Sequence, residues 1–323
     1  MIKLCAYGHY AHRQPLAYAQ IRAQCLGQIR LVEDISQADI VVLSHAKDLD
    51  SFGAELKTRL SPNQKLILLS EEPFWDTVWG PAPQTRDVVV QTAAGDLAVT
   101  QLNHQTSGIY DFDRIPYFLL THHHFRTRYD LWFRRNAQMR PRDWQDHFQA
   151  HFGRTAFVMA RRQSARYEVP FCLCNQRTQI AEACVQAVHI GQGWQDQPRR
   201  QDLTDWHLDK LLRLDRGFGF VGAVENTLLP NYVTEKLFDA YAVGAIPLYM
   251  ADAGHRVQDI AAAGTWINLL DVPAAQVPAR IGGFVDGPDF YETYAAQQAT
   301  LAGLFDTPDL LTAELIRLRD ALS

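Results

Sequence analysis

The sequence lacks several features that would point to particular classes of protein. No apolar run approaches the roughly 20 residues of a membrane-spanning helix, and the first residues, MIKLCAYGHY, are typical of a strand and not of a signal peptide. The formal net charge of −5 gives no basic field that would attract nucleic acid. The Gly-rich fingerprints of dinucleotide and mononucleotide loops are also absent. We therefore expect a protein with no transmembrane segment and no nucleic-acid partner.

Cysteine is scarce and has no metal-binding spacing. The five cysteines are odd in number and lie mostly within apolar segments. This usage favours reduced, buried thiols in a cytoplasmic protein and gives no zinc-type pairs. The triplet of consecutive histidines at 122–124 makes a poor chelate, because neighbouring residues point in different directions. We expect no metal site.

What the chain does have is an ordinary globular composition, 47% hydrophobic and 21% charged over 323 residues, a length that suits two domains. Apolar segments alternate with helical patterns, which predicts an α/β fold with doubly wound sheets. The predicted domains are residues 1–152 and 153–323, with residues 122–152 as a helical connector and C-terminal helices closing the second domain. Strands are expected at residues 2–7, 29–31, 38–44, 65–70, 88–90, 97–102, 115–120, 157–160, 169–174, 218–224, 246–250 and 265–270.

Residues 224–236, VENTLLPNYVTEK, are the most informative segment, and we call them the signature segment. Their polar side chains lie between two apolar stretches, which predicts a strand, a loop and a helix that starts near Thr234 as N-cap. Open parallel sheets bind ligands at such places. Lys236 in the first helical turn would add charge for a phosphate, and Glu235 could accept hydrogen bonds from sugar hydroxyls. The alternative is that Glu235 only complements the helix dipole and Lys236 is solvated.

The segment VENTLLPNYVTEKLFDAYAVGAIPLYM resembles the signature of the α-1,3/4-fucosyltransferases, glycosyltransferase family 10, and the bacterial members in particular. Thr227 stands where that family usually has serine. The resemblance implies a GT-B fold, in which two Rossmann-like domains face each other across a cleft. It also implies an inverting, metal-independent transfer of L-fucose from GDP-β-L-fucose to a glycan hydroxyl, most simply in an α-1,3 linkage to GlcNAc. No cofactor beyond the donor is expected, and the expected location is the cytoplasm or the periphery of the inner membrane.

The resemblance also implies roles for individual residues on the donor side. Arg177 and Lys236 would bind phosphate, Glu235 the donor hydroxyls, and Asn226 and Tyr232 would complete the donor contacts. Glu225 and Thr234 belong to the same loop, where Glu225 could be structural. Arg177 in CNQRT follows an expected strand and could bind the diphosphate bidentately, and the alternative is an Arg at the surface start of a helix.

An inverting transfer needs one general base, and Glu71-Glu72 in LLSEEPFW follow an expected strand end. Two adjacent carboxylates repel each other, which can raise one pKa toward that of a useful base. The residue types alone also fit a solvated acidic turn. The family pattern places Glu71 in the role of base, while a one-residue slip would give it to Glu72. Glu72, Trp75 and His123 are candidates for the acceptor side.

Two other functions remain open from the sequence. The chain could use a different nucleotide-sugar donor on the same fold, or it could bind a nucleotide-sugar without catalysis. The Asp111-Phe112-Asp113 tripeptide matches the DxD pattern of metal-dependent transferases, but it precedes an expected strand, and we interpret it as structural or acceptor-side.

Overall fold

The structure is a computed structural model that describes residues 1–306 except 26, 123, 195–200 and 288, together with residues 316 and 320. The chain divides into two compact units. Unit 1 contains Met1–His123 and Val169–Phe171, and unit 2 contains His124–Glu168 and Cys172–Pro308. The helical segment expected as a connector therefore groups with the second unit.

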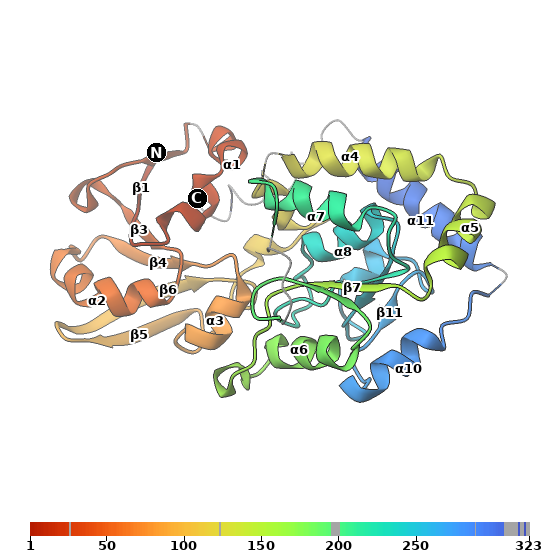
Figure 1. Ribbon diagram of the computed structural model, residues 1–323. Coiled ribbons are helices and arrows are strands. Elements are labelled where there is room, and N and C mark those ends of the chain that lie inside the picture. The colour runs from red at the N-terminus through yellow and green to blue at the C-terminus, as the bar shows by residue number, and fades with distance from the viewer. Residues whose placement is uncertain are drawn as a thin grey trace. The chain divides into compact units, whose positions relative to one another are not determined.

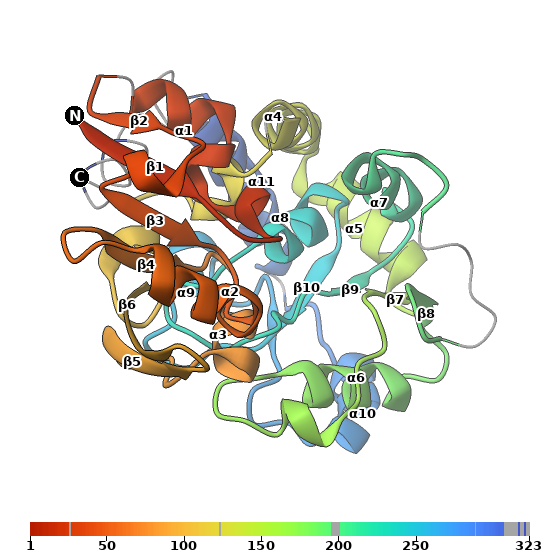
Figure 2. The same cartoon turned by 90° about the vertical axis from the view of Figure 1, so that its left-hand side faces the viewer.

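Unit 1 has one six-stranded sheet in the order β2-β1-β3-β4-β6-β5, and Figure 2 shows the strands in this order from top to bottom. All pairs are parallel except β5–β6, which form an antiparallel hairpin. The strands are β1 (Ile2–Ala6), β2 (Ile29–Leu31), β3 (Ile40–Leu43), β4 (Lys65–Leu69), β5 (Asp87–Thr92) and β6 (Gly95–Leu102). The helices are α1 (Ala19–Gln24), α2 (Lys47–Arg59) and α3 (Pro73–Trp79).

The central strand β3 of this sheet is buried on both faces. Val41 and Leu43 pack into one apolar cluster with Leu49 and Leu56 of α2. Val42, which points to the opposite face, packs into another cluster. Continuous apolar strands of this kind are expected where helices or loops cover both faces of a parallel sheet.

Unit 2 has a five-stranded sheet in the order β11-β10-β9-β7-β8, and every pair is parallel. Its strands are β7 (Thr155–Val158), β8 (Val188–Ile190), β9 (Phe220–Gly222), β10 (Ile246–Tyr249) and β11 (Ile267–Asn268). Its helices are α4 (His124–Ala137), α5 (Pro141–His151), α6 (Cys174–Ala183), α7 (Trp206–Leu214), α8 (Glu235–Ala242), α9 (Val257–Ile260), α10 (Val277–Gly282) and α11 (Phe290–Phe305).

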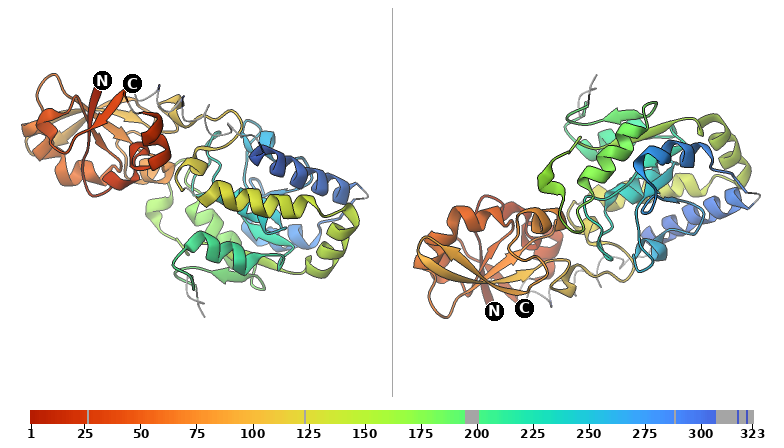
Figure 3. Two further views of the ribbon diagram at one scale, coloured as in Figure 1. Left: turned by 90° about the horizontal axis from the view of Figure 1, so that it is seen from above. Right: turned by 90° about the horizontal axis from the view of Figure 1, so that it is seen from below.

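Helices cover both faces of this second sheet. Figure 1 shows α6 and α10 on one side and α4, α7 and α8 on the other. α4 packs against α8 and lies beside α11, as the left view of Figure 3 shows. The predicted α/β class is confirmed, and each unit has the parallel sheet that a GT-B half requires.

Two expected strands are wrong. Residues 117–120 form a 3-10 helix, Tyr117–Leu120, whose four residues are all buried. Residues 169–173 form no strand; Cys172 makes one isolated bridge to Thr227, and the helix α6 already begins at Cys174. In both segments a short apolar run was taken for a buried strand, and periodicity cannot separate that from a buried turn. β8 was not expected, and the part of the expected C-terminal helices that follows residue 306 lies almost wholly outside the described residues.

Candidate active site

Two adjoining cavities lie at the carboxyl edge of the unit 2 sheet. The larger, of about 230 Å³, includes Ile190 at the end of β8, Gly191 after it, Lys210 and Arg213 of α7, and Glu235 of α8. The smaller, of about 140 Å³, includes Arg177, Asn226 and Lys236. Both share Val158 at the end of β7 and the residues Met159, Ala160 and Arg162 that follow it. Parallel sheets bind their ligands at this edge.

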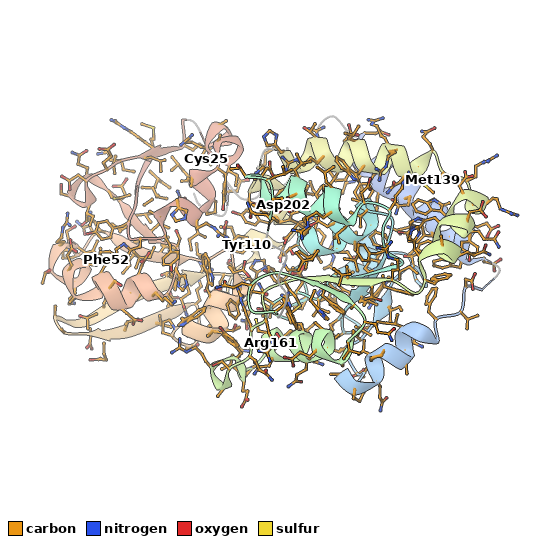
Figure 4. All side chains as sticks on the ribbon, viewed as in Figure 1. Cys25, Phe52, Tyr110, Met139, Arg161 and Asp202 are labelled. Carbon is orange, nitrogen blue, oxygen red and sulfur yellow. The ribbon has the colours of Figure 1, made fainter. Side chains whose placement is uncertain are left out.

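The close approach of the chain after β8 to the end of β7 requires a glycine at residue 191. Gly191 has a φ of +139°, and a Cβ atom there would overlap the backbone carbonyl of Met159. The chain after β8 can therefore approach the end of β7 only because no side chain intervenes. Arg161, two residues after Met159, forms an ion pair with Glu182 of α6. Figure 4 shows its side chain beside that helix.

Glu225 organises the signature segment. The buried carboxylate accepts hydrogen bonds from the Thr234 backbone N–H at 2.8 Å and from the Thr234 hydroxyl at 2.7 Å, and it pairs with Lys236 Nζ at 2.8 Å. Burial raises the pKa of Glu225, although Lys236 opposes that shift. Thr234 is the N-cap residue of α8, as predicted, but its side chain bonds to Glu225 and makes no cap hydrogen bond within the helix.

Glu235 and Lys236 are the first two residues of α8, and each lines one of the two adjoining cavities. Lys236 Nζ lies 2.8 Å from the Thr234 hydroxyl and 3.5 Å from Glu235 Oε1. Burial alone would raise the pKa of Glu235, but Lys236 and Lys210 outweigh it and hold the pKa below its ordinary value. The two residues therefore present an ionised carboxylate to the larger cavity and an ammonium group to the smaller one.

Arg177 is the most deeply buried cation of the site. It is only 7% exposed, and its Nη1 donates to the side-chain oxygen of Asn226. Its Nε donates to no acceptor among the described residues. Burial lowers the pKa of Arg177, because a guanidinium group that lacks an ionised partner is costly to desolvate. A buried cation with a spare donor beside a cavity is suited to an anionic ligand.

The structure thus brings together four of the five predicted donor residues. Arg177, Asn226 and Lys236 line one cavity, and Glu235 lines the adjoining one. Tyr232 is buried and is not among the residues that line either cavity.

Sequence reasoning missed the contribution of α7. Lys210 pairs with Asp239 at 2.6 Å and lies 3.9 Å from Glu235. Asp239, buried in α8, also accepts hydrogen bonds from His207 at 2.8 Å and from Tyr129 at 2.7 Å. Asp202, labelled in Figure 4, anchors the segment before α7 through its N–H to Asp209. No local motif marks Lys210, whereas Arg162, which lines both cavities, lies two residues after the expected strand at residues 157–160.

In unit 1, Glu71 follows β4 and is buried among three donors. Its Oε1 accepts from Arg13 Nε at 2.9 Å and from the Tyr18 hydroxyl at 2.7 Å, and its Oε2 accepts from the Tyr117 hydroxyl at 2.9 Å. Burial raises the pKa of Glu71 even though Arg13 lowers it. None of these three partners was predicted, because they lie 46 to 58 residues away in the chain.

The residues after Glu71 form an aromatic cluster. Glu72 is half-buried and precedes α3, which carries Trp75. The Trp75 ring stacks on His45 with centroids 4.5 Å apart, and the Arg13 guanidinium lies 4.9 Å from its centre. Arg13 therefore joins the carboxylate of Glu71 to the ring of Trp75. His123, the third candidate for the acceptor side, lies outside the described residues.

Within the described parts of the chain, no group of three His, Cys, Asp or Glu side chains is placed to hold a metal ion. Among the same residues, no helix has the length and apolar character needed to cross a bilayer.

A cation-lined cavity at the carboxyl edge of a parallel sheet is suited to an anionic ligand. Residues 172–296 match the family model described as glycosyltransferase family 10 (fucosyltransferase), C-terminal. The matched part is less than half of the chain, and it supports a fucosyltransferase-like enzyme. The matched residues include α6, the signature segment and α8, but none of the residues around Glu71.

Comparison with solved structures gives similar proteins at low identity. An α1,3-fucosyltransferase with GDP-fucose is 12% identical, with a TM-score of 0.42, and the alignment covers 93% of this chain and 90% of that one. A second α1,3-fucosyltransferase structure is 13% identical, with a TM-score of 0.44, over 94% of this chain and 80% of that one. No curated protein matches the sequence.

Proposed function

We propose that the protein transfers L-fucose from GDP-β-L-fucose to a hydroxyl group of a glycan, with inversion at the sugar and no metal ion. The α-1,3 linkage to GlcNAc is the proposed product. The observation that carries the proposal is the coincidence of the family 10 match with the cavity lined by Arg177, Asn226 and Lys236.

In the proposed reaction the acceptor oxygen forms a bond to C1 of fucose while the bond from C1 to the GDP oxygen breaks. The departing GDP gains one negative charge on the β-phosphate oxygen that was bonded to C1, and Arg177 and Lys236 are the proposed donors to the diphosphate. Lys236 is already paired with Glu225, so Arg177, with its spare Nε, is the stronger candidate for direct contact. Asn226 and Tyr232 would complete the donor contacts, and Glu235 would accept from donor hydroxyls.

The proposed base is Glu71, which would take the proton of the acceptor hydroxyl. Its raised pKa favours this role, because a carboxylate that binds a proton more readily is a stronger base. Glu72, half-buried and adjacent, is the alternative base, and Trp75 is proposed to stack on the acceptor sugar. The proposed place of action is the cytoplasm, at or near the inner membrane.

The test is to incubate the full chain with GDP-fucose and a panel of GlcNAc-containing acceptors and to identify products by mass spectrometry. A fucosylated product supports the proposal. A thermal-shift panel of GDP- and UDP-sugars separates the alternative donors, because a specific donor stabilises the protein by mass action. Donor binding without any product, and without effect of Glu71→Gln, would instead indicate a non-catalytic binding protein.

A further inference from the structure

The tripeptide Cys172-Leu173-Cys174 is hydrogen-bonded to Asn226, which lines the smaller cavity, and it has no part in the proposed reaction. All five cysteines are free, and four of them are buried, as the sequence predicted. Cys172 is the exception, since its side chain is half-buried. The thiols of Cys172 and Cys174 form a hydrogen bond with each other. This pair therefore combines a thiol that reagents can reach with a second thiol directly beside it.

The tripeptide is bonded to the loop that carries Asn226. The Leu173 N–H donates to the Asn226 carbonyl at 2.8 Å, and Cys174 Sγ lies 3.9 Å from the same oxygen. Cys172 bridges to Thr227, the next residue of that loop. Cys174 is also the first residue of α6, whose first turn carries Arg177. A change at the sulfur atoms would thus reach both partners of the Arg177–Asn226 hydrogen bond.

The charges around the pair distinguish the two sulfur atoms. The hydrogen bond from Cys174, followed by the positive charges of Arg162 and Arg177, lowers the pKa of Cys172 to about 7, against the effect of burial. The pKa of Cys174 is raised by its bond to Cys172 and by burial. Cys172 is also the more accessible of the two thiols, whereas Cys174 is buried. Because reaction requires an accessible thiolate, Cys172 is assigned as the nucleophile of the pair.

We propose that Cys172 is a peroxide-reactive modification site, that Cys174 resolves it to a disulfide, and that this disulfide weakens binding of the nucleotide donor. The thiol chemistry stands independently of the proposed function. The effect on the donor rests on the proposed donor site.

The chemistry balances in two steps. The Cys172 thiolate attacks one oxygen of the peroxide, the O–O bond breaks, and the released hydroxide takes a proton to become water. The sulfur atom of Cys174 then attacks the Cys172 sulfenic acid, the S–O bond breaks, and the leaving hydroxide takes the proton of Cys174. Two thiols are oxidised by two electrons, and one peroxide is reduced to two waters.

A disulfide requires the sulfur atoms to approach to about 2.05 Å, so the tripeptide must shift from its hydrogen-bonded position. That shift changes the contacts of Leu173 and Cys174 with Asn226. The coupling also works in reverse, because an anion between Arg162 and Arg177 neutralises the charges that favour the Cys172 thiolate. Bound GDP should therefore slow the reaction of Cys172.

The test treats the reduced full chain with hydrogen peroxide and follows it by mass spectrometry. Cleavage at Arg166 and Arg177 releases residues 167–177, which contain Cys172 and Cys174 and no other cysteine. We expect this peptide to lose two hydrogen atoms before any other cysteine reacts, more slowly with GDP present, and to recover them with dithiothreitol. In Cys174→Ser the Cys172 sulfenic acid should accumulate and be trapped by dimedone, and the buried Cys184→Ser should behave as the unchanged protein.

Titration with GDP before and after oxidation measures the coupling. Affinity should fall about fivefold or more on oxidation and return on reduction, with no such change in Cys172→Ser. If Cys172→Ser oxidises at the same rate as the unchanged protein, the modification site is refuted. If the disulfide forms but GDP affinity does not change, the effect on donor binding is refuted. If the reduced protein binds no GDP at all, the proposed function fails while the thiol chemistry stands.

Discussion

Each unit contains a buried glutamate just beyond a parallel strand, and the two are held in different ways. Glu225 in unit 2 takes its partners, Thr234 and Lys236, from 9 and 11 residues further along the chain. Glu71 in unit 1 takes Arg13, Tyr18 and Tyr117 from distant segments. Burial raises the pKa of both carboxyl groups. The difference shows why one site could be read from a short motif and the other could not.

The largest expected effect is the loss of transfer activity when Glu71, the proposed base, is replaced. Glu71→Gln keeps the shape of the side chain but cannot accept a proton, so the transfer rate should fall about 10³-fold while GDP binding is unchanged. Kinetics with GDP-fucose and acceptor, together with titration of GDP, measure both. Glu33→Gln, an exposed glutamate of unit 1, is the matched control. Full activity in Glu71→Gln and its loss in Glu72→Gln would assign the base to Glu72.

Replacing the cation of the Glu225–Lys236 pair and of the Glu71–Arg13 pair tests how burial of the cation affects the stability that each pair contributes. Lys236 is 15% exposed, so Lys236→Met leaves Glu225 charged and buried and should cost about 3 kcal/mol of unfolding free energy. Arg13 is 39% exposed and Glu71 keeps two tyrosine donors, so Arg13→Met should cost about 1 kcal/mol. Urea unfolding of the full chain gives both values. The double variant Glu225→Gln, Lys236→Met should recover much of the unfolding free energy that Lys236→Met loses. Equal losses of unfolding free energy in Lys236→Met and Arg13→Met would contradict the proposed difference between the two pairs.

The tyrosine hydroxyls in unit 1 should contribute smaller amounts. Tyr117 donates to Glu71 Oε2, whereas Tyr18 shares Oε1 with Arg13. Tyr117→Phe should therefore lower the unfolding free energy by about 1 kcal/mol or more, and Tyr18→Phe by less. Thermal or urea unfolding measures the order, and the reverse order would contradict the hydrogen-bond assignment.

The pH dependence gives the finest test. A base must be ionised, so transfer should fall as pH drops through the pKa of Glu71, at a midpoint above the ordinary value of 4.5. Arg13 lowers that pKa, and Arg13→Gln should move the midpoint upward by about one pH unit. Because the pKa is raised on folding, the stability contribution of protonated Glu71 is present below pH 4.5 and is lost as pH rises through the folded pKa. Profiles of kcat/KM against pH measure this midpoint. A midpoint below pH 4.5 would contradict the assignment of buried Glu71 as the base.

The sequence predicted much of the fold and part of the site. Strands with continuous apolar runs, such as Val41–Leu43 and Leu66–Leu69, were found because both faces of a parallel sheet are buried. The cavity residues Arg177, Asn226, Glu235 and Lys236 were found because they lie in or near short, recognisable motifs. Lys210, Arg13 and Tyr117 could not be found, since their roles depend on packing between segments that are far apart in the chain.

The central claim is that the unit 2 cavity binds the diphosphate of the donor through Arg177. Calorimetric titration of GDP-fucose into the full chain, compared with Arg177→Met and with the exposed control Arg166→Met, tests it most directly. The account predicts binding to the unchanged protein and to Arg166→Met, and affinity at least about tenfold weaker in Arg177→Met. Equal affinity in all three proteins would contradict it.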